Sequence, residues 1–304
     1  MDASTGRRAH PALACALAAL LLAGCERPPP ATRGVPTEAR ATVQAWLDGG
    51  TPDGEPTRPR PAVDRGLRTL GAEVYRLRCI PCHGVNGNGR GIHASRLSVP
   101  ARDFTKGVYE LRSTPTGTLP TDLDLFRTIG RGIHGSAMIP WSWLGEAERW
   151  AVIEHVKGFS PRFAEEGPGD PVPVPPAPPE TPARAARGAA AYVRNGCPKC
   201  HGDAGEGDGP SAPTLRRDGG EPVRPLPFSA GRFLRGGSLP ELWLTLATGL
   251  DGTPMPSYAA VPPEELWELA AFVRSRAGLA GGAPRRASPD PEERLGWRID
   301  VEGD

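Results

Sequence analysis

Two short runs of cysteine and histidine hold the residues of this chain best suited to chemistry. They are Cys79-Ile80-Pro81-Cys82-His83 and Cys197-Pro198-Lys199-Cys200-His201. Two thiols three positions apart lie on one turn of a helix, where they can add to the two vinyl groups of one porphyrin, and the next imidazole can bind its iron. In an exported protein this Cys-x-x-Cys-His pattern is an attachment site for haem c. The sequence therefore predicts two covalently bound haems, attached through the four cysteines, with His83 and His201 as iron ligands.

Two other uses of such cysteines fit the pattern less well. A zinc site needs four ligands that converge tetrahedrally, and adjacent Cys and His residues do not readily hold one ion together. A redox pair of the thioredoxin type needs no following histidine and is expected in a βαβ setting, which the sequence lacks. The two copies, about one domain apart, also argue against a chance match.

The first 25 residues have the composition of an export signal. Arg7 and Arg8 supply a basic start, and the apolar run from Pro11 to Gly24 is shorter than the roughly 20 residues that span a bilayer. The run ends in Leu22-Ala23-Gly24-Cys25, which resembles a bacterial lipobox. That resemblance implies cleavage before Cys25 and lipidation of this residue, whereas an ordinary signal peptide would leave it unmodified. We therefore expect an exported protein, lipid-anchored at Cys25 on the periplasmic side of a bacterial membrane.

Proline-rich stretches divide the rest of the chain into two segments of domain size. Residues 65–163 and 183–278 each have the length of a typical single domain. The predicted surroundings of these two segments are a signal peptide at 1–24, a Pro-rich tether at 25–64 with a possible short helix from Val35 to Leu47, a Pro-rich linker at 164–182 and a flexible tail at 279–304.

The charge balance excludes nucleic acid as an expected partner. The chain has 36 basic and 35 acidic side chains, of which residues 1–24 hold two and one, so 34 of each remain. No basic excess is available to neutralise phosphates. Residues 65–163 carry 14 Lys and Arg against 8 Asp and Glu, a net charge of +6. This surplus indicates either an acidic docking partner for the first segment or a generally solvated surface.

The two segments repeat the same order of elements. A helix is predicted before each Cys-x-x-Cys-His run, with an apolar stripe at Leu67, Leu70, Val74 and Leu77 in the first copy and Tyr192 echoing Tyr75 in the second. A glycine-rich loop follows each haem histidine, then a middle helix that begins with a capping box, and finally a helix with a tryptophan. The paired residues are Thr121 and Asp124 with Ser238 and Glu241 for the caps, and Trp150 with Trp267. An all-α fold of two helical domains, each wrapped around one haem, follows from this pattern.

Methionine is rare enough to be informative. Apart from Met1, the chain has only Met138 and Met255, which follow His83 and His201 by 55 and 54 residues. Each stands in a Gly/Pro-rich loop before a last helix, where a thioether can be held against iron, and a His/Met pair raises the reduction potential. The other use of methionine is to fill gaps in a core. His134, four residues before Met138, is a competing ligand in the first segment.

Each segment resembles a class I cytochrome c domain. The resemblance rests on the helix that leads into Cys-x-x-Cys-His, the glycine loop, the methionine loop and the aromatic residue of the last helix. The second segment matches the loop pattern fully through Gly252-Thr253-Pro254-Met255-Pro256, whereas in the first Ile139 separates Met138 from Pro140. The family implies covalent haem loading after export and a partly exposed haem edge as the port for electrons.

These expectations describe a membrane-tethered dihaem c-type cytochrome that passes single electrons between respiratory donors and a terminal reductase or oxidase. Its partners would be redox proteins and, through the lipid, the membrane; no small-molecule substrate is expected. One alternative is a non-catalytic electron-transfer subunit of a larger respiratory complex. The other is a dihaem oxidoreductase, peroxidase-like or thiosulfate-oxidising, that keeps an open or unusual ligand position at the first haem. A carrier rather than an enzyme fits best, because His/Met pairs close both irons.

Overall fold

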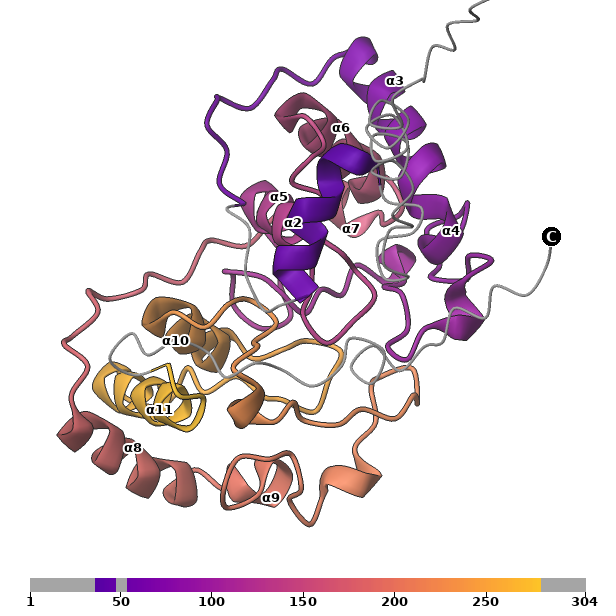
Figure 1. The fold of residues 1–304 in the computed structure, drawn as a ribbon. Coiled ribbons are helices and arrows are strands. Elements are labelled where there is room, and N and C mark those ends of the chain that lie inside the picture. Colours follow the sequence, from indigo (N-terminus) through magenta and orange to yellow (C-terminus); the bar gives the residue numbers. More distant parts are fainter. Residues whose placement is uncertain (1–35, 48–53, 280–304) are drawn as a thin grey trace, which may run out of the picture.

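The computed structural model describes residues 36–47 and 54–279 of the chain. These residues form two helical lobes (Figure 1) and no β-strand, with only two isolated β-bridges. The all-α prediction is confirmed. We call residues 54–165 the first lobe and residues 182–279 the second lobe; an extended segment joins them at one side of the molecule.

Each lobe contains a first helix, a short helical turn that carries the Cys-x-x-Cys-His run, a middle helix and a last helix. In the first lobe these are α3 (Arg65–Val74), the π-helical turn η2 (Tyr75–Cys79), α4 (Ile80–His83), α5 (Asp122–Arg131) and α6 (Glu146–Lys157), with α7 (Arg162–Glu165) and the short turns η3 (Ala94–Arg96) and η4 (Phe104–Lys106). In the second they are α8 (Pro182–Arg194), α9 (Pro198–His201), α10 (Leu239–Thr248) and α11 (Pro263–Arg276), with the turns η5 (Ala212–Thr214) and η6 (Phe228–Ala230).

The middle helices begin and end where their capping residues require. Thr121 and Asp124 form both bonds of a capping box at the start of α5, and Ser238 and Glu241 do so at α10. Each box satisfies amide groups that a helix leaves without a partner in its first turn. α10 ends at Gly249, whose φ of 66° suits glycine. Both capping boxes were predicted from the sequence and are confirmed.

The first and last helices of each lobe cross at a glycine. A Cβ atom at Gly71 of α3 would lie 2.1 Å from the carbonyl oxygen of Ala151 in α6. The same atom at Gly188 of α8 would lie 1.9 Å from the carbonyl oxygen of Glu268 in α11. Only a residue without a side chain allows the two backbones to approach this closely. The predicted core tryptophans of the last helices, Trp150 and Trp267, are both buried.

The apolar stripe of the first helix is shorter than predicted. Leu67 and Val74 are buried, but Leu77 is 50 % exposed. Leu77 lies within η2, where the chain adopts π-helical hydrogen bonds for one turn. A π-helical turn is closed by i→i+5 hydrogen bonds and contains more residues than an α-helical turn, so the 3.6-residue spacing that placed Leu77 on the apolar face no longer applies. The prediction for Leu77 is therefore wrong.

The described parts of the predicted tether lie against the first lobe. Residues 37–47 form helix α2 (Thr37–Leu47), which buries Val43 and Trp46. Further along, Glu55 forms ion pairs with Arg127 and Arg131 at 2.7 and 3.0 Å. The segment contains apolar and charged side chains besides its prolines, and these allow it to pack. The helix expected between Val35 and Leu47 is present over Thr37–Leu47. The described residues of the predicted tether, 36–47 and 54–64, contact the first lobe.

Two backbone hydrogen bonds attach the first part of the linker at 164–182 to the first lobe. The amide of Gly169 donates to the carbonyl of Leu119 at 3.1 Å, and the amide of Val172 donates to that of Ser113 at 2.7 Å. The residues between α7 and α8 form no helix, as their proline content predicts.

Several predictions fall on other parts of the chain. The signal peptide at 1–24, the lipidated Cys25 and nearly all of the tail at 279–304 lie outside the described residues. Among the residues that are described, no helix has the length and hydropathy needed to cross a membrane.

We predict that Gly71→Ala destabilises the first lobe. The new methyl group would force α3 and α6 apart, and such overpacking costs about 1–3 kcal/mol in the free energy of unfolding. Urea denaturation followed by far-ultraviolet circular dichroism measures the change. Gly66→Ala, at an exposed position of the same helix, is the matched control and should have little effect or a small stabilising one. Equal stability of the two variants would contradict the close crossing.

Candidate functional site

The two Cys-x-x-Cys-His runs border a single cavity between the lobes. Its volume is about 720 Å³, and its lining contains all four cysteines, both histidines of the runs and both methionines, Met138 and Met255. Most of the remaining lining side chains are apolar, and they come from both lobes. The sequence predicted two separate sites. The structure shows that the two sites open into one another.

His83 is oriented by two contacts. Its ring stacks on Phe104 at 4.5 Å between centroids, with 17° between the planes. Its Nδ1 lies 3.1 Å from the carbonyl oxygen of Arg102. A carbonyl only accepts hydrogen bonds, so Nδ1 carries the proton and Nε2 keeps the lone pair that a metal requires.

His201 also contacts an aromatic ring but lacks the hydrogen bond. Its ring lies 5.0 Å from that of Phe228 between centroids, tilted by 30°, and its buried Nδ1 has no hydrogen-bond partner among the described residues. Burial lowers the pKa of His201 to about 4 and also lowers the pKa of His83. Both imidazoles are therefore neutral at pH 7, the form that binds iron.

Burial raises the pKa of three of the cysteine thiols, Cys79, Cys82 and Cys197, and so keeps them protonated at neutral pH. Burial raises the pKa of Cys79 to about 12, with a further contribution from Cys82. Metal binding uses the thiolate form, and no group of three or more His, Cys, Asp or Glu side chains converges as a metal site within residues 36–47 and 54–279. The arrangement favours covalent attachment of a porphyrin over chelation of an ion.

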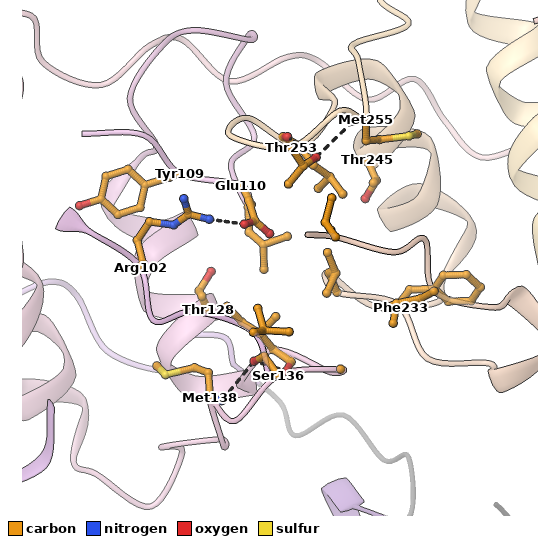
Figure 2. A pocket seen from close by; sticks show the side chains of 18 of the residues that line it. Arg102, Tyr109, Glu110, Thr128, Ser136, Met138, Phe233, Thr245, Thr253 and Met255 are labelled. Atoms are coloured by element: carbon orange, nitrogen blue, oxygen red, sulfur yellow. Dashed lines mark hydrogen bonds and ion pairs between the residues drawn. The ribbon is translucent and has the colours of Figure 1, made fainter. Parts of the chain in front are cut away.

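The two methionine loops have nearly the same hydrogen bonds. We define the first as residues 133–138 and the second as residues 250–255. The amide of the first residue donates to the methionine carbonyl, at 2.8 Å for Met138 and 3.1 Å for Met255. The methionine amide in turn donates to a hydroxyl two residues earlier, Ser136 at 3.1 Å and Thr253 at 3.2 Å. Figure 2 shows both methionines at the cavity, with their sulfur atoms directed to opposite sides.

The competing histidines of the first lobe do not border the cavity. His134 is buried and stacks on Trp46 of α2, with 4.9 Å between centroids and 10° between the planes. His93 is exposed, and His155 packs against Tyr75 and Phe159. The described lining contains no imidazole other than His83 and His201. Of the two candidate ligands, Met138 thus lines the same cavity as His83, whereas His134 does not.

Trp141 and Trp143 have different surroundings although they are near neighbours. Trp141 lines the cavity. Trp143 lies behind it, 5.1 Å away between ring centroids, and the guanidinium of Arg78 covers its ring at 5.2 Å. Trp141 thus covers the cavity beside the first methionine loop.

Several side chains that support the site were not identified from the sequence. The buried hydroxyls of Tyr75 and Tyr192 donate to the carbonyls of Gly84 and Gly202, at 2.8 and 2.6 Å, and so fasten each first helix to the residue after the haem histidine. The matched tyrosines in the repeat were the available signal. Phe104 and Phe228 also occur at matched positions, but their ring contacts depend on the fold.

A charged cluster in the cavity lining was also missed. Glu110 of the first lobe pairs with Arg102 of the same lobe and with Arg217 of the second. Figure 2 shows the Arg102 and Glu110 pair between the two methionine loops. Residues 107 positions apart in the chain form one of these pairs, and no local sequence pattern predicts such a contact.

The residues present fit a haem. An apolar cavity and, on each side, a neutral buried imidazole, a methionine thioether and a pair of cysteines are the groups that covalent haem c requires. The carbonyl groups of the Cys-x-x-Cys-His turns lie close to glycines of the following loops: a Cβ atom at Gly91 would lie 2.3 Å from the Pro81 oxygen, and one at Gly209 would lie 2.4 Å from the Pro198 oxygen.

Comparisons with known proteins agree with this geometry. Residues 185–277 match the family model described as cytochrome c, and residues 67–156 match the one described as cytochrome c oxidase, cbb3-type, subunit III. Comparison with curated proteins finds no match.

Among solved structures, the chain is similar to one described as the Kuenenia stuttgartiensis reducing HAO-like protein complex Kustc0457/Kustc0458. The identity is 39 % and the TM-score 0.67, over 72 % of this chain and 98 % of that one. Cytochrome c domains carry covalently bound haem c and transfer electrons. The chain belongs to the class I c-type cytochromes, as a tandem of two such domains.

Proposed function

We propose that this protein is a dihaem electron carrier that moves single electrons between redox proteins. One haem would be attached at Cys79 and Cys82, and the other at Cys197 and Cys200. The observation that carries the proposal is the presence of two His/Met pairs, His83 with Met138 and His201 with Met255, in the lining of one cavity. A bound haem supplies a reversible one-electron couple at its iron.

The side chains of the protein hold and enclose the group. The neutral imidazoles each offer one nitrogen, and the closed methionine loops fix the position of each thioether. Apolar residues from both lobes line most of the cavity and would limit the contact of a bound haem with water, which helps to set its reduction potential. His83 with Met138 and His201 with Met255 would each hold one iron, which would leave no ligand position for a substrate. This arrangement supports a carrier over a dihaem oxidoreductase.

We further propose that the protein acts at the periplasmic side of a bacterial membrane. The support is the signal-like start and the lipobox resemblance around Cys25. Lipid at Cys25 would keep the carrier near membrane-bound respiratory donors and a terminal reductase or oxidase. The net charge of +6 on residues 65–163 favours an acidic face on a partner.

A second candidate function is that of an electron-transfer subunit in a larger complex. The observation that favours it is the 39 % identity, across 98 % of its length, to a chain from a structure described as a reducing HAO-like protein complex. The chemistry of the two candidates is the same, and they differ in whether the protein is permanently bound to an enzyme.

We predict that the haem-loaded protein carries two haems and that Cys79→Ala with Cys82→Ala carries one. Loss of both thiols removes the covalent attachment in the first lobe and leaves the second intact. Mass spectrometry of the denatured protein counts the attached groups. The corresponding change at Cys197 and Cys200 is the matched control and should also leave one haem. Two haems on either variant would contradict the assignment.

We predict that both irons are low-spin and bound by methionine in the ferric protein. Each should contribute to the far-red absorption band that arises from charge transfer between methionine sulfur and iron. Met138→Leu should remove about half of the band, because one of two equivalent ligands is lost. Met255→Leu should remove the other half. High-spin iron in the unsubstituted protein, or a full band in Met138→Leu, would favour the oxidoreductase.

Isolation of the tagged protein from its own membranes distinguishes the two candidate functions. A carrier should elute from size-exclusion chromatography at the mass of a single chain. A subunit should elute in fixed stoichiometry with an enzyme and should stay bound at high salt, which weakens transient electrostatic encounters. Cys25→Ala should release the protein from the membrane fraction if the lipid anchor is correct.

A further inference from the structure

The two methionine loops are contacted at the same position from outside. Counting back four residues from each methionine gives His134 in the first loop and Asp251 in the second. Both side chains are directed to groups that do not belong to the three main helices of their own lobe. The first contact is a ring stack and the second is made of hydrogen bonds and an ion pair, but both occur four residues before the methionine.

Asp251 is bound by three donors of the first lobe. Its Oδ1 accepts from Nη2 of Arg112 at 2.7 Å and from the hydroxyl of Thr116 at 2.6 Å. Its Oδ2 accepts from the amide of Gly117 at 2.8 Å. Both carboxylate oxygens are therefore engaged by one loop of the other lobe, and the second methionine loop is tied to it.

Arg112 is a rigid anchor for this contact. Its side chain is fully buried, and its guanidinium also donates to the carbonyls of Pro115 and Thr248, at 3.1 and 2.9 Å. The Thr248 carbonyl belongs to the end of α10, just before the second methionine loop. A buried guanidinium needs a counter-charge, and Asp251 forms the ion pair with it. Arg112 of the first lobe thus binds the second lobe at two points, the last residue of α10 and Asp251 in the second methionine loop.

In the first lobe, helix α2 has the corresponding position. Trp46 stacks on His134, and Val43, Trp46 and Leu47 form an apolar cluster with Ile139, the residue after Met138. α2 therefore contacts His134 within the first methionine loop and Ile139 directly after it. α2 also follows the segment that begins at Cys25.

We propose that these two contacts are clamps that position the axial methionines. The first-lobe loop with Arg112, Thr116 and Gly117 clamps the second methionine loop through Asp251, and α2 clamps the first through Trp46. Both loops contain a glycine with positive φ, Gly135 at 78° and Gly252 at 82°, next to the clamped residue. Glycine leaves the backbone many conformations, and the clamp restricts it to the one in which the thioether faces the cavity.

The clamps make the ligation of each iron depend on a part of the chain outside the three main helices of its own lobe. Ligation of the second iron by Met255 depends on the first lobe, and ligation of the first iron by Met138 depends on α2. Arg112, Asp251 and Trp46 act through the methionines and are positioning residues. This inference rests on the proposed ligation by Met138 and Met255.

The test uses the full haem-loaded chain in a Met138→His background. There the far-red band comes from Met255 alone. Imidazole is added to the ferric protein, and bleaching of the band gives the concentration at which it displaces the methionine. Coupling between linked sites is typically about 5–150-fold, so Asp251→Ala should lower the displacing concentration at least about fivefold. Arg112 itself is left unchanged because its loss could prevent folding.

Glu241→Gln is the matched control. Glu241 of α10 pairs with Arg131 of the first lobe at 2.9 Å, so the change removes an ion pair across the same interface without touching the loop. It should leave the displacing concentration near that of the background. Far-ultraviolet circular dichroism confirms that each variant is folded. An equal displacing concentration for Asp251→Ala and Glu241→Gln would overturn the clamp.

The first clamp is tested in the same way in a Met255→His background. Trp46→Ala should lower the displacing concentration, and Trp46→Phe, which keeps a ring to stack on His134, should restore most of it. No difference between the alanine and phenylalanine variants would overturn this clamp. Absence of the far-red band from the background proteins themselves would instead refute the proposed ligation, so the two failures are distinguishable.

Discussion

The close crossing of the first and last helix in each lobe determines where the haem-binding residues lie. At both crossings a glycine lets one backbone contact the carbonyl of the other, Gly71 against Ala151 and Gly188 against Glu268. The turn with the Cys-x-x-Cys-His run continues from the first helix, so its position follows from the crossing. The tyrosine hydroxyl bonds to Gly84 and Gly202 then hold the end of that turn. The middle and last helices supply the apolar wall.

Ion pairs, one of them with a fully buried arginine, join the two lobes. Arg112 is fully buried and pairs with Asp251, while Arg131 and Glu241 pair at the edge. A buried ion pair gives little net stability, but loss of one partner typically costs about 3–5 kcal/mol because the other charge stays buried. Such a contact therefore fixes one relative placement of the lobes more than it adds affinity. The common cavity requires this placement, since its lining comes from both sides.

Local patterns in the sequence were enough for the elements and for the candidate ligands. The capping boxes at Thr121 and Ser238 and the buried tryptophans of the last helices follow from residue type and spacing, and the structure confirms them. The tandem cytochrome c resemblance is confirmed by the comparisons. The matched positions of Met138 and Met255 gave a prediction of iron ligands, and both methionines line the cavity.

Contacts between distant parts of the chain could not be predicted in this way. The Arg112 to Asp251 pair joins residues 139 positions apart, and the Trp46 to His134 stack joins an expected tether to an expected spare ligand. Leu77 was misplaced because it lies in the π-helical turn η2, where the 3.6-residue period of an α-helix does not apply. His134 illustrates the limit best: its identity allowed iron ligation, and only the position of α2 shows that its ring is directed elsewhere.

The two lobes have the same arrangement of helices, but the contacts that hold their haem histidines and methionine loops differ. His83 has a carbonyl partner for Nδ1, whereas the same atom of His201 has none among the described residues. The first methionine loop is contacted by a helix from the start of the chain, and the second by the preceding lobe. A hydrogen bond to an axial histidine increases its basicity and so changes the potential of the metal. Two domains with the same fold can therefore hold chemically different irons, because the groups that distinguish them come from outside the repeated part.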